Sequence, residues 1–159
     1  QNITGFMVGT EAERGGIARH SAKLVYAMAT ARVARLTVII GGSFGAGNYG
    51  MCGRGFDPRF LFAWPNSRIA TMCADVAATV LTDLRRSSLK AAADDAEIAE
   101  IDRATRAQFT EQSDPYYATA RLWDDGLIEP SETRDVIGLC LALAAAEAPA
   151  TGPSPVFRM

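Results

Sequence analysis

The sequence is poor in the side chains that usually carry metal and redox chemistry. Its 159 residues contain one histidine and three cysteines, and the cysteines lie far apart with no C-x-x-C pair. This spacing indicates neither a zinc site nor a disulfide framework, and a reducing compartment is the simplest interpretation. The formal net charge of −2 argues against a partner held by phosphate contacts, so no nucleic acid is expected.

The sequence also lacks the long apolar runs of membrane proteins. No stretch reaches the length of a bilayer span and no signal peptide is found, so no membrane partner is expected. Hydrophobic residues make up 48% of the chain and charged residues 21%, which is typical of a globular protein. The length suits one domain. The chain begins at Gln1 without methionine, in an apolar segment, which predicts that it is cut from a longer protein.

Strand-like and helix-like segments alternate along the chain, which predicts an α/β domain. Strands are expected at 3–8, 36–40, 60–63 and 68–72. Helices are expected at 11–31, 48–53, 74–86, 91–112, within 116–122, and at 131–146, where Ser131 would cap the helix. Residues 124–126 read as a turn. We expect one domain over 1–148, followed by an irregular Pro/Gly/Ser-rich tail at 149–159.

The most informative segment is the loop after the predicted strand at 36–40. Residues 41–50 read GGSFGAGNYG, carry no charge and lead into a predicted helix. Glycines let a ligand approach the backbone, and the first amides of a helix have no intrahelical acceptor. The loop therefore predicts a site for an oxyanion or a polarised carbonyl oxygen. The alternative is a tight strand-to-helix turn in which the glycines serve packing.

Two familiar nucleotide-binding motifs do not fit this loop. A P-loop needs lysine and then serine or threonine after its last glycine, but Asn48 and Tyr49 stand there. Residues 45–50 match the dinucleotide pattern G-x-G-x-x-G loosely. However, residues 62–66, some twenty positions further on, contain no acidic residue to bind a ribose.

The loop and the run after it, GGSFGAGNYGMCGR at 41–54, resemble the carboxyltransferase (β) subunit of biotin-dependent acyl-CoA carboxylases. Methylcrotonoyl-CoA carboxylase is the nearest match and geranyl-CoA carboxylase the next. Further segments agree in the same order: QNITGFMVG at 1–9, GGIARH at 15–20, PRFLFAWPN at 58–66, PYYATARLWDDG at 115–126 and VFRM at 156–159. The resemblance implies a crotonase-like (ClpP/crotonase) fold, a spiral of β-β-α units. It also implies that this chain is most of the C-terminal, biotin-side domain.

The family resemblance implies carboxyl transfer from carboxybiotin to an α,β-unsaturated branched acyl-CoA, 3-methylcrotonoyl-CoA as in leucine degradation, or geranoyl-CoA. Biotin would arrive on the carboxyl carrier domain of an α subunit that also holds biotin carboxylase. The acyl-CoA would bind the N-terminal carboxyltransferase domain of a neighbouring subunit. A homo-oligomer of at least a dimer, no metal in this domain and an inactive isolated fragment are therefore expected. The expected location is the cytoplasm in a bacterium and the mitochondrial matrix in a eukaryote.

The resemblance also places the biotin-side oxyanion hole in the glycine loop. The backbone amides of Ala46 and Gly47 are the expected donors, and Gly45 is the next candidate. The candidate biotin-binding residues are Thr4, Gly5, Phe6, Phe44, Asn48 and Tyr49. Simpler alternatives exist for each: a strand leading into a turn at 4–6, packing for the aromatic rings, and helix capping for the asparagine.

The remaining polar residues have structural interpretations. His20 lies in a predicted helix and reads as a surface or interface residue rather than a base. Asp124 and Asp125 are adjacent in a turn, where their side chains diverge, and read as structural. Three arginines are expected to pair with acids in this domain or across a subunit interface: Arg54, Arg59 and Arg68.

Two other functions remain compatible with the sequence. A CoA-linked decarboxylase has a carboxyltransferase subunit of the same fold, and the fragment alone is compatible with a non-catalytic binding or assembly module. A hydratase is disfavoured, because it needs a pair of acidic residues in the loop and none lies between Gly41 and Met51. Residues 10–13 and 71–77 depart from the common family pattern, which leaves the acyl substrate open.

Overall fold

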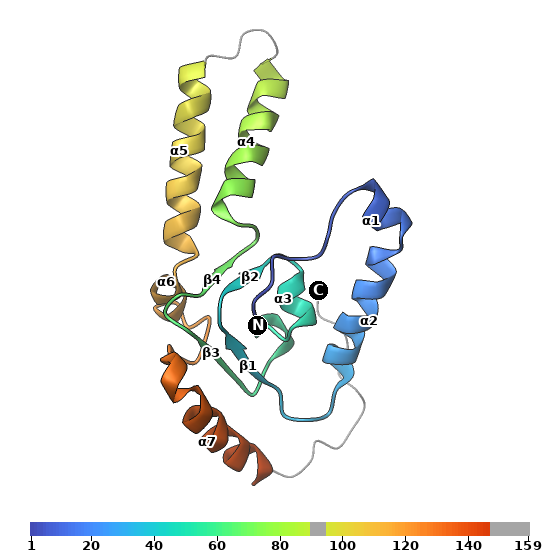
Figure 1. Cartoon of the computed structure of the whole chain (residues 1–159), viewed down its shortest axis with the longest axis vertical. Coiled ribbons are helices and arrows are strands. Elements are labelled where there is room, and N and C mark those ends of the chain that lie inside the picture. Colours follow the sequence, from blue (N-terminus) through green and yellow to red (C-terminus); the bar gives the residue numbers. More distant parts are fainter. Residues whose placement is uncertain (90–94, 147–159) are drawn as a thin grey trace.

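The computed structural model describes residues 1–89 and 95–146. Four short strands lie at the centre, with helices around them (Figure 1). The strands are β1 (Leu36–Ile39), β2 (Gly42–Phe44), β3 (Phe60–Ala63) and β4 (Arg68–Ala70). The helices are α1 (Thr10–Arg14), α2 (Ile17–Thr30), α3 (Gly47–Gly50), α4 (Ala74–Leu89), α5 (Asp95–Gln112), α6 (Pro115–Thr119) and α7 (Thr133–Ala145), with 3-10 turns η1 (Arg54–Phe56) and η3 (Pro130–Glu132).

Two successive β-β-α units, β1-β2-α3 and β3-β4-α4, stack against each other. Corresponding strands pair in parallel, β1 with β3 from Leu36 opposite Phe60, and β2 with β4 from Gly42 opposite Arg68. Isolated parallel bridges extend both ladders, from Ile3 to Ser43 and from Ala63 to Leu127. Each unit therefore repeats the path of the one before it, and the ends of β2 and β4 lie side by side.

Two apolar clusters fix the strands and the loop between them. Ile39, Leu61 and Ala63 are buried together on β1 and β3, which matches the alternating burial along both strands. Ala29 of α2 packs with Cys52 and Phe56, which follow α3. The glycine loop therefore runs between two packed regions.

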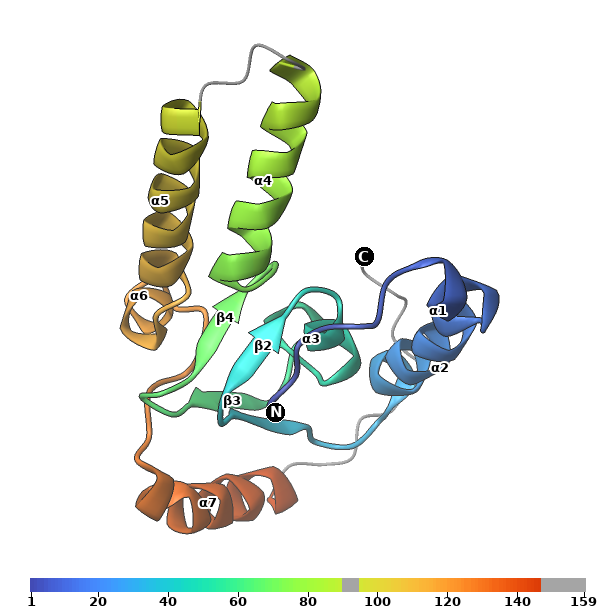
Figure 2. The same ribbon diagram turned by 45° about the horizontal axis from the view of Figure 1, so that its top comes forward.

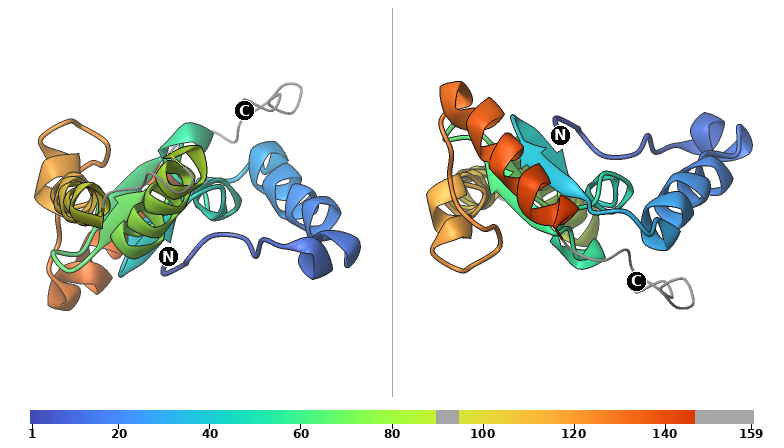
Figure 3. Two further views of the ribbon diagram at one scale, coloured as in Figure 1. Left: turned by 90° about the horizontal axis from the view of Figure 1, so that it is seen from above. Right: turned by 90° about the horizontal axis from the view of Figure 1, so that it is seen from below.

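The outer helices project in different directions. α4 and α5 form an antiparallel hairpin that extends away from the strands, and α7 lies on the opposite side (Figures 1 and 2). α2 lies beside α3, and α1 lies at the outer end of α2 (Figures 1 and 3). The indole Nε1–H of Trp64 donates to Thr133 Oγ1 at 3.0 Å and ties α7 to the end of β3.

Most of the predicted regular elements are confirmed. The strands at 36–39, 60–63 and 68–70 and the helices after Cys73 and Asp114 agree with the sequence patterns to within a few residues. The turn at 124–126 is confirmed, because the Gly126 N–H donates to Asp124 Oδ1 at 3.0 Å. The predicted helix at 91–112 is observed from Asp95. Its first residues, 91–94, and the predicted tail at 149–159 lie outside the described residues.

The predicted strand at 3–8 is wrong. Only Ile3 joins a ladder, through its bridge to Ser43, and the backbone turns at Gly5 with φ +106°. Met7 and Val8 are 71% and 89% exposed. An apolar segment becomes a strand only where a neighbouring strand accepts its hydrogen bonds, and within the described residues none lies beside positions 4–8.

The prediction of one continuous helix at 11–31 is wrong, because two helices are observed. α1 ends at Arg14, and α2 begins only at Ile17. Gly16 between them has φ +85°, a left-handed conformation that breaks the helical path and that glycine adopts without steric cost.

The starts and ends of two other helices also differ from the prediction. α3 ends at Gly50 instead of continuing to 53, because the backbone reverses at Cys52 with φ +59°. Ser131 does not cap α7, since it lies inside the preceding turn η3. Glu129 and Glu132 form the reciprocal capping pair around that turn instead, with the Glu129 N–H donating to Glu132 Oε2 at 2.9 Å.

Candidate functional site

The glycine loop turns sharply between β2 and α3. Gly45 has φ +59°, and a Cβ at this position would lie 3.1 Å from the Thr71 carbonyl oxygen. Ala46 follows with φ −67° as the N-cap residue, and Gly47 is the first residue of α3. The left-handed conformation of Gly45 therefore lets the chain leave the strand and enter the helix within two residues.

The amides of this turn differ in whether they have an acceptor. The Gly45 N–H donates to the Ala70 carbonyl at 3.1 Å, which continues the β2–β4 ladder, so this third candidate donor is occupied. Those of Asn48 and Tyr49 donate to the Gly45 and Ala46 carbonyls at 3.2 and 3.1 Å. Within residues 1–89 and 95–146, no backbone acceptor faces the amides of Ala46 and Gly47. Two adjacent amides thus lack a backbone acceptor, of which one belongs to the exposed residue Ala46 and the other to the buried residue Gly47.

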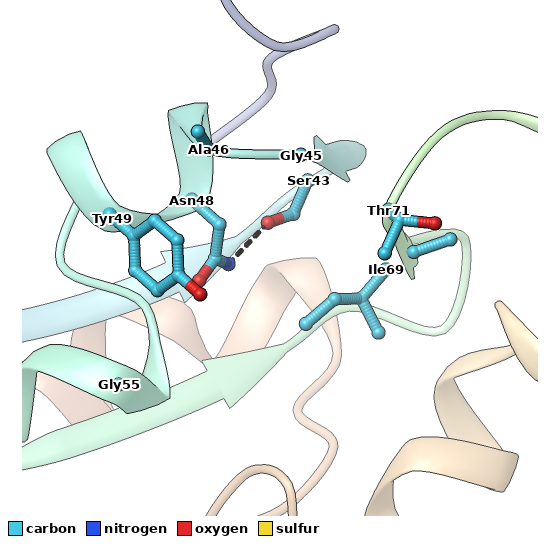
Figure 4. A pocket seen from close by; sticks show the side chains of 9 residues that line it. Ser43, Gly45, Ala46, Asn48, Tyr49, Gly55, Ile69 and Thr71 are labelled. Carbon is cyan, nitrogen blue, oxygen red and sulfur yellow. Dashed lines mark hydrogen bonds between the residues drawn. The ribbon is translucent and has the colours of Figure 1, made fainter. Parts of the chain in front are cut away.

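A cleft of about 470 Å³ opens beside this turn, between the loop and the end of β4. Figure 4 shows the Tyr49 ring and Asn48 on one side and Ile69 and Thr71 on the other. No lining side chain carries a charge, so the cleft suits a neutral ligand with polar atoms. The lining residues are Ser43, Gly45, Ala46, Asn48, Tyr49, Gly55, Ile69, Ala70 and Thr71.

Packing and hydrogen bonds orient the two side chains on the α3 wall. The Tyr49 ring meets the Phe56 ring edge to face, with centroids 5.5 Å apart. Asn48 Nδ2 donates to Ser43 Oγ at 2.6 Å (Figure 4). The alternative interpretation of Asn48 as a helix cap is excluded, because Ala46 occupies the N-cap position and Asn48 lies inside α3.

The other predicted binding residues pack near the loop without lining the cleft. A Cβ on Gly5 would lie 3.3 Å from the Phe44 carbonyl oxygen, and one on Gly47 would lie 2.8 Å from the Ile3 side chain. Phe6 contacts α3 in the same way, since its Cζ lies 3.4 Å from a Cβ built on Gly50. Ile3, Gly5 and Phe6 therefore support the loop from a side other than the cleft, and Thr4 is exposed and does not line the cleft.

Sequence reasoning missed the wall contributed by Ile69, Ala70 and Thr71, together with Ser43 and Gly55. The feature that could have revealed this wall is the equivalence of β2 and β4, which are the second strands of two successive β-β-α units. Parallel pairing of such strands brings their carboxyl ends together, opposite Gly45 in this case.

The acidic and basic residues around the cleft have structural partners. Arg54 pairs with Asp125 at 3.0 Å and Arg68 with Asp114 at 3.7 Å, which confirms the predicted pairing of these arginines within the domain. Asp125 Oδ2 also accepts the Leu61 N–H at 2.7 Å, so the structural interpretation of this carboxylate is confirmed. The Arg59 guanidinium lies 4.9 Å from the centroid of the Phe60 ring.

Burial raises the pKa of two ionisable groups, the Cys52 thiol and the Asp124 carboxyl, the latter despite hydrogen bonds from Thr119 and Gly126. His20 is exposed on α2, as predicted. Among the residues that the structure describes, no three His, Cys, Asp or Glu side chains gather as metal ligands, and no helix has the length and apolarity to cross a bilayer.

Comparison with known proteins connects this chain to one family. Residues 1–159 match the family model of the carboxyl transferase domain. The chain is 56% identical over 149 residues to the biotin-dependent 3-methylcrotonyl-coenzyme A carboxylase beta1 subunit of Mycobacterium tuberculosis, covering 91% of this chain and 28% of that protein. It is 50% identical over 147 residues to the mitochondrial methylcrotonoyl-CoA carboxylase beta chain of Arabidopsis thaliana, covering 91% of this chain and 25% of that protein.

A solved structure gives the same result. The beta subunit of geranyl-CoA carboxylase from P. aeruginosa superposes with a TM-score of 0.85 at 45% identity, over 99% of this chain and 30% of that one. The chain thus spans less than a third of the length of these relatives. The predicted resemblance is confirmed, and the chain belongs to the carboxyl transferase domain family, which includes the β subunits of acyl-CoA carboxylases.

Proposed function

We propose that this chain supplies the biotin side of the carboxyltransferase site in a biotin-dependent acyl-CoA carboxylase. The proposed acyl substrate is 3-methylcrotonoyl-CoA or geranoyl-CoA, the substrates in the names of its relatives. The observation that carries the proposal is the pair of adjacent amides at Ala46 and Gly47, which face no backbone acceptor beside an uncharged cleft in a chain of this family.

The residues present fit a biotin ring system. The ring system is uncharged and largely apolar, and its ureido group has one oxygen acceptor. The cleft offers the Tyr49 ring and Ile69 as apolar walls and places no charged side chain against them. When bound, biotin would supply the transferable carboxyl group and a ureido oxygen on which negative charge develops.

The proposed task of the loop is to stabilise that charge. The Ala46 and Gly47 amides would donate to the oxygen from positions that the fold has already set. Removing one such donor in other enzymes costs about 3–4 kcal/mol of transition-state stabilisation. The Gly45 amide is not assigned a donor role, because it is occupied by the Ala70 carbonyl.

The proposed site is completed outside this chain. We assign the acyl-CoA to the N-terminal carboxyltransferase domain of a neighbouring subunit, and biotin to the carrier domain of an α subunit, so that a homo-oligomer of at least a dimer is required. Exposed apolar side chains such as Leu84 at 61% and Leu139 at 64% support further burial in an assembly. The proposed location is the cytoplasm in a bacterium and the mitochondrial matrix in a eukaryote.

We also assign a crotonase-like spiral to residues 1–148. The two stacked β-β-α units and their parallel pairing support this assignment, and the bridges at Ile3 and Leu127 support further turns on both sides.

The proposal is tested with the full-length β subunit and its biotinylated α partner. Incorporation of labelled bicarbonate into acid-stable product is measured with each of the two acyl-CoA substrates, and carboxylation of one is expected. No carboxylation of either would overturn the substrate assignment. Decarboxylation of a malonyl-type thioester instead would favour the decarboxylase. For the non-catalytic alternative, this chain is mixed with the complementary N-terminal domain, and restored activity would count against a module that only assembles.

A further inference from the structure

Asn48 is held on two sides although it lines the cleft. Its Nδ2 donates to Ser43 Oγ at 2.6 Å, and its backbone carbonyl accepts the Gly53 N–H at 2.7 Å. A Cβ built on Gly53 would overlap the Asn48 carboxamide. The side chain therefore lies in a slot between β2 and the backbone that follows α3.

Ser43 is a fixed anchor at one end of this slot. It is 1% exposed, lies in the middle of β2 opposite Ile69 of β4, and is bridged to Ile3. Its hydroxyl oxygen also accepts Gln1 Nε2 at 2.7 Å. A hydroxyl oxygen that accepts two hydrogen bonds and belongs to a paired strand has little freedom to move.

Gly53 closes the other end, and its conformation does not explain why it is glycine. Its φ of −69° and ψ of 179° are open to any residue. What a side chain would meet there is the Asn48 carboxamide. Position 53 is therefore restricted by the space that Asn48 occupies while it is bonded to Ser43.

We propose that Ser43, Asn48 and Gly53 form a clamp that sets the position of the Ala46 and Gly47 amides relative to β2. Asn48 is the positioning residue of this clamp, and it acts through the turn instead of contacting biotin, because one Nδ2–H is committed to Ser43 and the carboxamide is confined against Gly53. α3 has only four residues, so one side chain inside it controls the placement of the whole turn. The proposal deepens the proposed function and rests on it.

The first test is Gly53→Ala in the full-length β subunit assembled with its α partner. The substitution forces Asn48 away from Ser43, and kcat for carboxyl transfer is expected to fall at least about tenfold while KM for acyl-CoA stays within twofold. Hydrogen exchange of the segment 45–50, measured by mass spectrometry, is expected to accelerate. Gly138→Ala in α7 is the matched control, because a Cβ there meets no atom within 4 Å. Unchanged kcat and unchanged exchange in Gly53→Ala would overturn the clamp.

The second test removes the Asn48 carboxamide, whose overlap with a Cβ at position 53 is the expected cause of the Gly53→Ala effect. Asn48→Ala takes away the atoms that a Cβ at position 53 would overlap. In the Asn48→Ala background, adding Gly53→Ala is therefore expected to change kcat and exchange by less than twofold. A full additional loss in the double variant would show that position 53 acts independently and would reject the clamp.

The two proposals fail in different ways. If the wild-type enzyme transfers no carboxyl group, the proposed function is wrong, while hydrogen exchange of 45–50 still tests the clamp without any turnover. If Asn48 contacted the ligand directly, Asn48→Ala would weaken binding of free biotin with no change in exchange of 45–50, and that result would overturn the positioning role. Ser43→Ala gives an independent variant and is expected to accelerate the same exchange.

Discussion

The cleft and the α4–α5 hairpin are held together by different forces. Along the lining of the cleft, contacts are neutral: short hydrogen bonds from Asn48 and Gln1 reach buried Ser43, and glycines lie where backbone and side chains approach closely. The ion pairs of Arg54 and Arg68 lie outside this lining. In the hairpin, the buried residues are accompanied by ion pairs near the surface; the buried residues are Ala77, Ala78, Ile98 and Thr105. These pairs join Arg85 to Glu97, Arg103 to Glu100, and Arg106 to Asp75 and Asp102.

This difference indicates in which region the side chains must be positioned accurately. A buried neutral hydrogen bond fixes two groups at one distance and is little affected by salt. An exposed ion pair between long side chains permits several geometries and contributes little net free energy. We therefore expect the cleft to be sensitive to small changes in shape and the hairpin to tolerate them.

The largest effect is expected where the cleft loses an amide. Ala46→Pro removes the N–H, and the observed φ of −67° already matches that of proline. Because the donor would stabilise the transition state, kcat for carboxyl transfer is expected to fall about 10²–10³-fold. Ala46→Ser keeps the amide and is expected to retain activity within severalfold. Equal losses of kcat in Ala46→Pro and Ala46→Ser would contradict the proposed role of this amide as an oxyanion donor.

A smaller effect, on stability, is expected from a buried neutral bond beneath the loop. Thr37 Oγ1 donates to the Cys52 carbonyl at 2.8 Å, and Thr37 is buried. Thr37→Val keeps the shape but leaves that carbonyl unpaired, which is expected to lower the free energy of unfolding by about 1–3 kcal/mol. Urea denaturation measures the change. The same substitution at exposed Thr79 on α4 is the control and is expected to cost less than about 0.5 kcal/mol.

The hairpin is expected to respond more weakly. Arg85 and Glu97 are 2.6 Å apart with side chains about two-fifths exposed. Arg85→Gln is expected to lower the free energy of unfolding by less than about 1 kcal/mol, with the loss shrinking further at high salt. Carboxyl transfer should not change. A loss of several kcal/mol that persists in 1 M salt would contradict this view of the hairpin.

The smallest effect is a change in pH dependence at Asp124. Burial raises the pKa of this carboxyl in the folded state above 3.8, so folding favours its protonated form. Its contribution to stability is therefore fully present below pH 3.8 and is lost as the pH rises through the folded-state pKa. Asp124→Asn cannot ionise, so its stability relative to wild type should increase with pH above 3.8. Urea denaturation between pH 3 and 7 checks the sign, and a decrease would show that the ionised form is favoured by its hydrogen bonds.

The sequence predicted those parts of the fold whose signals are local. The β-branched run at 36–39 and the aromatic run at 60–63 became strands, and the helix predicted at 74–86 is observed as α4. The segment at 3–8 carries the same apolar signal, but only Ile3 finds a partner, and that depends on where distant parts of the chain lie. Gly16 broke a helix that its neighbours favour.

The candidate site was predictable on one side only. The turn at 45–47 was found because glycines and a helix start follow each other in sequence. The opposite wall at Ile69 and Thr71 depends on the pairing of β2 with β4, which no local pattern specifies. The same pairing occupies the Gly45 amide, and only the tertiary structure shows that this third candidate donor already has an acceptor.

The parallel pairing of β1 with β3 and of β2 with β4 has a consequence for how the chain folds. Leu36 must find Phe60, and Gly42 must find Arg68, before either ladder exists, whereas α4 and α5 are neighbours in the chain. Closing long loops is slow because entropy is lost before the contacts form. The hairpin is therefore expected to form early and the cleft late, so the proposed biotin-side half-site is expected to arise only in the final stage of folding.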